Sequence, residues 1–88
     1  MSYYVTECSE SSFIKTLIWS SESQTLLVRF SSGTIWAYYR VPKKEYLALS
    51  SSQSVGQYFN IAIRDIYVSE RVAYFSDLEK VRTVGEEE

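Results

Sequence analysis

Histidine is absent from the 88 residues, and cysteine occurs once, at Cys8. Without an imidazole the chain lacks the usual general base, cannot build a serine–histidine–acid triad, and is excluded from nearly all zinc sites. A lone cysteine can form neither an internal disulfide nor a zinc cluster, and we interpret Cys8 as a small apolar side chain. The carboxylates Asp65, Glu70 and Asp77 follow no metal-ligand spacing. We therefore expect no catalytic residues, no metal, no cofactor and no enzymatic activity.

Long apolar runs are also missing. The stretch from Thr25 to Phe30 is far shorter than the roughly 20 residues that cross a bilayer, and the N-terminus lacks a signal-peptide pattern. We expect a cytoplasmic protein, in a host cytoplasm if the protein is viral, with no membrane contact. The net charge is −2 and the nine Lys and Arg residues are spread along the chain, which argues against general duplex binding. A small phosphate-bearing ligand remains compatible.

The residues that are present suffice for one core, because 45% are apolar and 16% aromatic. A chain this short has room for one domain only. We divide it into an N-terminal segment (1–10), a domain (11–67), a C-terminal extension (68–85) and an acidic tail (86–88).

Three strands with short connections predict an antiparallel β-meander. Alternating apolar residues place the strands at 13–19, 25–30 and 35–41, and Gly33 suits the second turn. In the first strand the alternation puts Ile14 with Thr16 and Ile18 on one side, and Leu17 with Trp19 on the other.

Two helices are predicted after the meander. Pro42 ends the third strand and can open a helix over 43–51, and Ser54 begins a capping box in which Gln57 reaches back, opening a helix that runs to about 67. The residues expected on the packed face of this second helix are Phe59, Ile63, Ile66 and Tyr67. A short extended segment at 72–75 and a short helix over 76–85 complete the prediction. The fold class is α+β: a three-stranded antiparallel β-meander followed by two helices and a short C-terminal extension.

Several short motifs between residues 11 and 67 resemble the KTSC domain family, in this order: Ser11-Ser12-Phe13-Ile14, Leu26, Val28, Phe30, Gly33, Val41-Pro42, Ser54, Gly56, Tyr58-Phe59-Asn60, Ile63 and Arg64. The central Tyr-x-Tyr of the family is Trp36-Ala37-Tyr38 here. KTSC domains occur alone and at the C-terminus of some lysyl-tRNA synthetases, so the resemblance implies the fold and suggests RNA binding by association.

Trp36 and Tyr38 point to one face of the third strand, beside Leu26, Val28 or Phe30 across the hairpin. They can serve as core residues, or they can form a stacking platform for a nucleobase, worth about 1 to 3 kcal/mol per base. Both interpretations stay open at this point.

Arg40 and Arg64 are the candidates for contacting phosphate, because a guanidinium offers paired donors that match phosphate oxygens. Ser54 and Gly56, at the start of the second helix, can either form a structural cap or approach a phosphate closely. Asn60 can hydrogen-bond a base edge, or it can be a buried amide that ties the helix to the sheet.

The function that these residues favour is non-catalytic nucleotide binding. One form of it is a phage sponge, which sequesters a cyclic-nucleotide immune signal without changing it. Such a protein is expected to be a homo-oligomer, because 88 residues seldom enclose a ligand alone. The alternatives are an RNA-binding accessory module that takes single-stranded RNA, and a structural or protein-interaction module that uses surface tyrosines.

Overall fold

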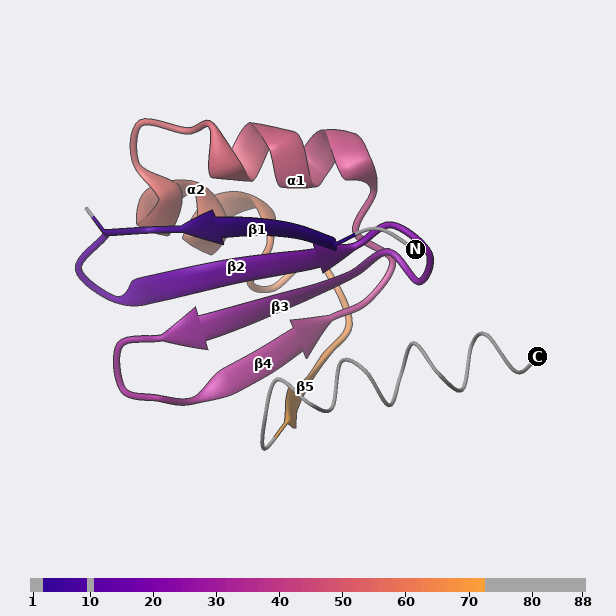
Figure 1. The fold of residues 1–88 in the computed structure, drawn as a ribbon, viewed down its shortest axis with the longest axis horizontal. Helices are drawn as coiled ribbons and strands as arrows, with labels where there is room; N and C mark the ends of the chain where they lie inside the picture. Colours follow the sequence, from indigo (N-terminus) through magenta and orange to yellow (C-terminus); the bar gives the residue numbers. More distant parts are fainter. Residues whose placement is uncertain (1–2, 10, 73–88) are drawn as a thin grey trace.

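The computed structural model describes residues 3–9 and 11–72. In this part of the chain, one five-stranded antiparallel sheet has the order β1-β2-β3-β4-β5. Two helices, α1 and α2, follow β4 and lie on one face of the sheet (Figure 1). The elements are β1 (Tyr3–Glu7), β2 (Ile14–Ser20), β3 (Thr25–Phe30), β4 (Ile35–Tyr38), α1 (Lys43–Ser50), α2 (Val55–Ala62) and β5 (Ser69–Val72).

The main core lies between the sheet and the helices. Its buried residues include Ile14, Leu17, Trp19, Leu26, Val28, Tyr38, Val41, Tyr46, Leu49, Phe59 and Ile63. Trp19 stacks on Tyr46 of α1 with ring centroids 5.8 Å apart, and its indole N–H donates to the carbonyl of Val41 at 2.8 Å. Because a buried N–H without a partner is costly, this bond fixes the segment between β4 and α1 against β2.

A smaller apolar cluster occupies the opposite face of the sheet. Leu27, Ile35 and Ala37 are buried there, and Ile18 packs against them. Both faces of the central strands are therefore apolar, which explains why β3 is buried over its first four residues, from Thr25 to Val28.

The α+β class and the central meander are confirmed, but three strands is an undercount. β1 and β5 add one strand at each edge of the sheet. β1 falls within the segment 1–10 that we expected to precede the domain, and β5 overlaps the expected extended segment 72–75 only at Val72. The remainder of that segment, the helix predicted over 76–85 and the acidic tail lie outside the described residues.

Two element ends differ from the prediction. β4 ends at Tyr38 rather than Val41, because Arg40 has a φ of 60° and turns the chain toward α1. α2 ends at Ala62 rather than 67, and the chain continues in turns. Phe59 and Ile63 are buried as expected, but Ile66 is 66% exposed, so its place on the packed face was wrong.

The predicted face of Ile14 was also wrong. The pairing of β2 with β3 shifts register between Ile14 and Thr16. This irregularity places Ile14 in the main core together with Leu17 and Trp19, whereas Ile18 packs on the other face. A strict alternation cannot anticipate such a shift.

Helix α1 agrees with its prediction to within one residue, and it begins after Pro42 as expected. No helix in the described ranges is long and apolar enough to span a membrane.

Candidate functional site

A cavity of about 510 Å³ opens beside β4 and the end of α2, and we call it the aromatic cavity. Its size falls within the roughly 300 to 1,000 Å³ typical of small-molecule sites. Its lining residues are Phe13, Phe30, Ser32, Thr34, Trp36, Tyr38, Phe59, Arg64, Asp65 and Ser69.

Trp36 and Tyr38 reach this cavity from β4. They pair across the sheet with Val28 and Leu26, which confirms the expected side-by-side placement. Tyr38 is only 4% exposed and meets Phe59 edge-on, with ring centroids 5.4 Å apart. Tyr38 is therefore a core residue at the floor of the cavity, whereas half-buried Trp36 keeps part of its ring accessible.

Charged side chains line one side of the aromatic cavity. Arg64 and Asp65, just after α2, are both exposed, and Arg64 Nη1 donates to Asn60 Oδ1 at 3.3 Å. Burial raises the pKa of the Tyr38 hydroxyl; the Arg64 charge opposes this pKa shift and the Asp65 charge adds to it. Both charges therefore act at the cavity floor.

Arg71 of β5 is the cross-strand partner of Trp36. Side chains directly opposite one another in a sheet share a face, so Arg71 brings a second guanidinium beside the indole. A ligand with both a planar ring and a negative group meets suitable partners here.

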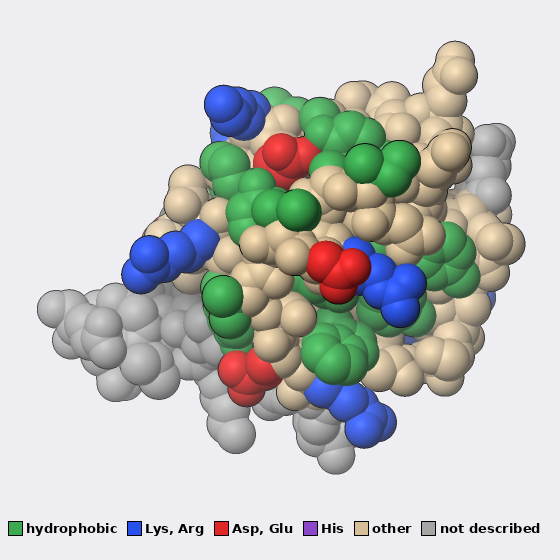
Figure 2. Space-filling model, turned by 180° about the vertical axis from the view of Figure 1, so that it is seen from behind, with side chains coloured by type: hydrophobic (Ala, Val, Ile, Leu, Met, Phe, Trp, Pro, Cys, Tyr) green, Lys and Arg blue, Asp and Glu red, His purple; other side chains and the backbone are tan. Residues whose placement is uncertain are grey.

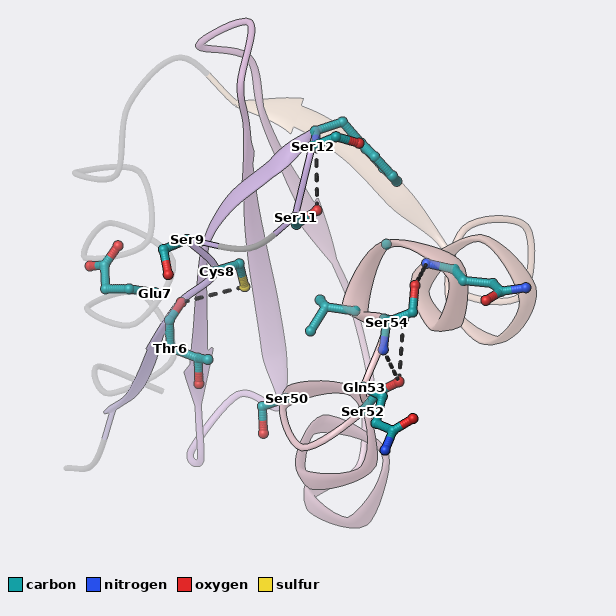
Figure 3. A pocket seen from close by; sticks show the side chains of 14 residues that line it. Thr6, Glu7, Cys8, Ser9, Ser11, Ser12, Ser50, Ser52, Gln53 and Ser54 are labelled. Carbon is teal, nitrogen blue, oxygen red and sulfur yellow. Dashed lines mark hydrogen bonds between the residues drawn. The ribbon is translucent and has the colours of Figure 1, made fainter.

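A second cavity, of about 460 Å³, lies between the loop that follows β1 and the start of α2, and we call it the serine cavity. Figure 3 shows Thr6, Glu7, Cys8 and Ser9 on one side of it and the serines around residue 52 on the other. The remaining lining residues are Ser11, Ser12, Phe13, Ser50, Gln53, Ser54, Val55, Gly56 and Gln57.

Ser54 and Gly56 act here as parts of a helix start. Ser54 Oγ accepts from the backbone N–H of Gln57 at 3.4 Å, as predicted, while the N–H of Ser54 donates to Ser52 Oγ at 3.2 Å. A Cβ added at Gly56 would lie 2.5 Å from Cε1 of Phe13, so glycine allows this ring to pack closely against α2. Burial, and secondarily the charge of Glu7, raises the pKa of the Cys8 thiol, which disfavours a reactive thiolate.

The seven predicted site residues are thus divided in space. Trp36, Tyr38 and Arg64 meet in the aromatic cavity, and Ser54 with Gly56 borders the serine cavity. Arg40 is exposed and lines neither cavity. Asn60 is exposed rather than buried, so it does not tie the helix to the sheet; it contacts Arg64 instead.

The sequence-based prediction missed Asp65, which enters the aromatic cavity from the turns after α2, and Ser69, which enters it from the start of β5. A signal was present, because Asp65 directly follows the predicted phosphate contact Arg64. Phe13, the residue shared by both cavities, was assigned to a strand and given no role in the site.

Basic side chains are dispersed on the surface. In Figure 2 they appear singly among hydrophobic and polar side chains on the face shown, without forming a stripe. Within residues 3–9 and 11–72 there is also no group of three or more cysteine and acidic side chains that could hold a metal ion. The face shown in Figure 2 therefore presents no continuous basic stripe of the kind that a long polyanion requires.

Comparisons with known proteins relate the chain to lysine–tRNA ligases. It is 36% identical over 64 residues to lysine–tRNA ligase from Trichormus variabilis and 33% identical to that from Nostoc punctiforme, covering 73% of this chain. The chain spans only 11% of the length of these curated relatives. A protein of Stutzerimonas stutzeri is 39% identical over 51 residues, covering 58% of this chain and 72% of its own length.

The fold is shared with a KTSC domain protein from Yersinia pestis, whose crystal structure matches with a TM-score of 0.75 at 19% identity. That match covers 82% of this chain and all of the other. The family model for the KTSC domain matches residues 10–67, which agrees with the motifs found between residues 11 and 67. The chain therefore belongs to the KTSC domain family.

Proposed function

We propose that the aromatic cavity binds a nucleotide without transforming it. The observation that supports this proposal is the meeting of Trp36 and Tyr38 from β4 with Arg64 from the turn after α2, in one cavity of about 510 Å³. The half-buried indole of Trp36 stacks on the base, and stacking is worth about 1 to 3 kcal/mol per base. The Arg64 guanidinium then faces the phosphate, with Arg71 as a second cation nearby.

Asp65 gives the proposed site a base preference. A carboxylate in the cavity repels phosphate but accepts hydrogen bonds from the amino group of a base. We therefore expect adenine, guanine or cytosine nucleotides to bind more tightly than uridine nucleotides. The side of the cavity at Arg64 takes the phosphate, and the carboxylate of Asp65 takes the base edge.

The absence of histidine supports binding over catalysis, because the cavity residues offer a carboxylate and a guanidinium but no imidazole to act as a general base. A site that binds without catalysis would act by sequestration. In the proposed sponge role, it removes a cyclic nucleotide from solution and releases it chemically unchanged.

A second candidate function is the binding of single-stranded RNA. The relatives named lysine–tRNA ligase favour it, since those proteins act on a tRNA. An unpaired base can enter the aromatic cavity in the same way as a free nucleotide, with the rest of the strand outside.

Isothermal titration calorimetry with a panel of mono-, di- and cyclic nucleotides, and with a short single-stranded RNA, tests both candidates. Micromolar or tighter binding of one nucleotide, recovered intact after heating the complex, supports the first. Binding of the oligonucleotide alone supports the second, and a hydrolysed product would contradict non-catalytic binding.

Arg64→Ala should weaken nucleotide binding about tenfold or more, on the scale of one lost charge-assisted hydrogen bond. Arg40→Asn is the matched control, because Arg40 is an exposed arginine outside both cavities and asparagine tolerates its left-handed backbone. Asp65→Asn should reduce the difference in affinity between nucleotides whose base carries an amino group and uridine nucleotides. Equal losses in the Arg64 and Arg40 variants would place the phosphate elsewhere.

A further inference from the structure

The edge of the sheet at β1 presents backbone hydrogen-bonding groups of Val5 and Glu7 that pair with no other described strand. Among the described strands, β1 pairs with β2 alone. The N–H of Cys8, directly after β1, donates to the carbonyl of Lys15 at 2.8 Å, in line with the β1–β2 register. The backbone N–H and C=O groups of successive residues alternate in direction along a strand. Those of Thr6 and Tyr4 therefore also point toward β2, whereas those of Val5 and Glu7 point away from it, toward the open edge.

An apolar row crosses the sheet and ends at this edge. Consecutive cross-strand pairs join Val5 to Ile18, Ile18 to Leu27, and Leu27 to Ala37. Leu27 and Ala37 are each 1% exposed, but Val5 is 59% exposed. The row is therefore buried in the middle of the sheet and open at its end.

We propose that β1 pairs antiparallel with β1 of a second copy, about a two-fold axis that passes beside Val5. Val5 then lies opposite Val5 of the other copy, as a hydrogen-bonded pair with Cα atoms about 5.5 Å apart. The two sheets become one sheet of ten strands, and the apolar row continues from one copy into the other.

The charges of β1 favour this register. Its acidic residue, Glu7, lies opposite Tyr3 of the other copy, where a carboxylate and a phenol are compatible neighbours. The two Glu7 side chains are four positions apart along the strands, roughly 13 Å, which exceeds the screening length at physiological salt. A shift of the axis to Glu7 would instead set the two carboxylates against each other and leave most of β1 unpaired.

Edge protection is weak along this strand. β1 contains no proline or lysine, and the register shift of the sheet lies between β2 and β3 rather than in β1. Natural edges that avoid self-pairing commonly carry such features. A second copy of this chain is thus the occupant whose chemistry matches the edge, because the strand is complementary to itself.

Sedimentation equilibrium of the full chain, from micromolar to millimolar concentration, tests the proposal. The expected mass is twice the 10.2 kDa of one copy. Val5→Lys puts two ammonium groups opposite each other and should weaken the dimer about tenfold or more. Ile61→Lys is the control, since Ile61 is 72% exposed on α2 and should leave the dimer intact.

Mixing the Val5→Lys chain with a Val5→Glu chain tests the register itself. Each variant alone should be monomeric, and the mixture should form a heterodimer, because position 5 faces position 5. Circular dichroism confirms that both variants are folded. Three results would each overturn the proposal: a wild-type chain with the mass of one copy, a dimer that survives Val5→Lys, or a mixture that stays monomeric.

Discussion

Gly56 of α2 packs closely against Phe13, the residue directly before β2. A Cβ there would lie 2.5 Å from Phe13 Cε1, and this ring is itself stacked on Phe30 at 6.2 Å. Gly56→Ala should therefore destabilise the fold by about 1 to 2 kcal/mol, because the overpacking cost of about 1 to 3 kcal/mol outweighs the higher helix propensity of alanine. Urea denaturation measures the loss.

A second variant distinguishes the steric contact with the Phe13 ring from any other effect of replacing the glycine. In a Phe13→Leu background the clash is relieved, so Gly56→Ala should cost about 1 kcal/mol less than it does in the wild type. The same cost in both backgrounds would show that the glycine is required for another reason.

Residue type alone predicted part of the aromatic cavity. Trp36, Tyr38 and Arg64 were identifiable because aromatic rings on a strand and an arginine on a polar helix face are visible in the sequence. Asp65 was not, since it lies in the turns after Ala62 where an unbroken helix was expected. Ser69 was not, since it begins β5, a strand that was missing from the prediction at that position. Periodicity continues through Tyr67, but Ile66 is exposed, so hydrophobic spacing alone placed the helix end incorrectly.

At the scale of elements, the start of α2 depends on Ser54. Its hydroxyl accepts from the N–H of Gln57 at 3.4 Å, which is long for a cap. Ser54→Ala should therefore cost about 0.5 to 1 kcal/mol, the lower part of the usual range for caps. Chemical denaturation followed by circular dichroism measures the change.

Two further variants test whether this loss of stability comes from the cap. Gln53→Ala, at an exposed position in the same loop, should change the stability by less than about 0.5 kcal/mol. Ser54→Asp should preserve the cap, because aspartate is also a good N-cap and its charge suits the helix N-terminus. Equal losses in Ser54→Ala and Gln53→Ala would contradict the capping role.

The central elements were predictable and the edge strands were not. β3 and α1 follow strong local signals: alternation from Thr25 to Phe30, and Pro42 before the helix. β1 and β5 have the burial patterns of half-exposed strands, with exposed residues at Tyr3, Val5 and Glu7 in the first. An edge strand contributes few core residues, so its sequence resembles a polar segment until pairing with a neighbour is known.

At the scale of the whole molecule, the proposed ligand site and the proposed dimer interface lie on different parts of the sheet. The aromatic cavity lies on the helix side of β4, whereas the proposed dimer extends the sheet from its β1 edge, three strands away. Pairing at β1 therefore leaves the aromatic cavity of each copy accessible. A dimer would carry two such cavities and could hold two ligands, so ligand stoichiometry per chain should be unaffected by Val5→Lys.

Buried tyrosines connect the stability of the whole molecule to alkaline pH. Burial raises the pKa of the hydroxyls of Tyr38 and Tyr46, so each is harder to ionise in the folded chain than in the unfolded chain. The folded state then binds more protons above about pH 10, the pKa of an unperturbed tyrosine, and the stabilisation present below that pH is lost as the pH rises through the folded-state pKa. The free energy of unfolding should fall steadily above about pH 10, which urea denaturation at a series of pH values measures, with tyrosinate absorbance reporting ionisation. Replacing both residues by phenylalanine should make this decline shallower, whereas an equally steep decline in the double variant would assign it to other groups.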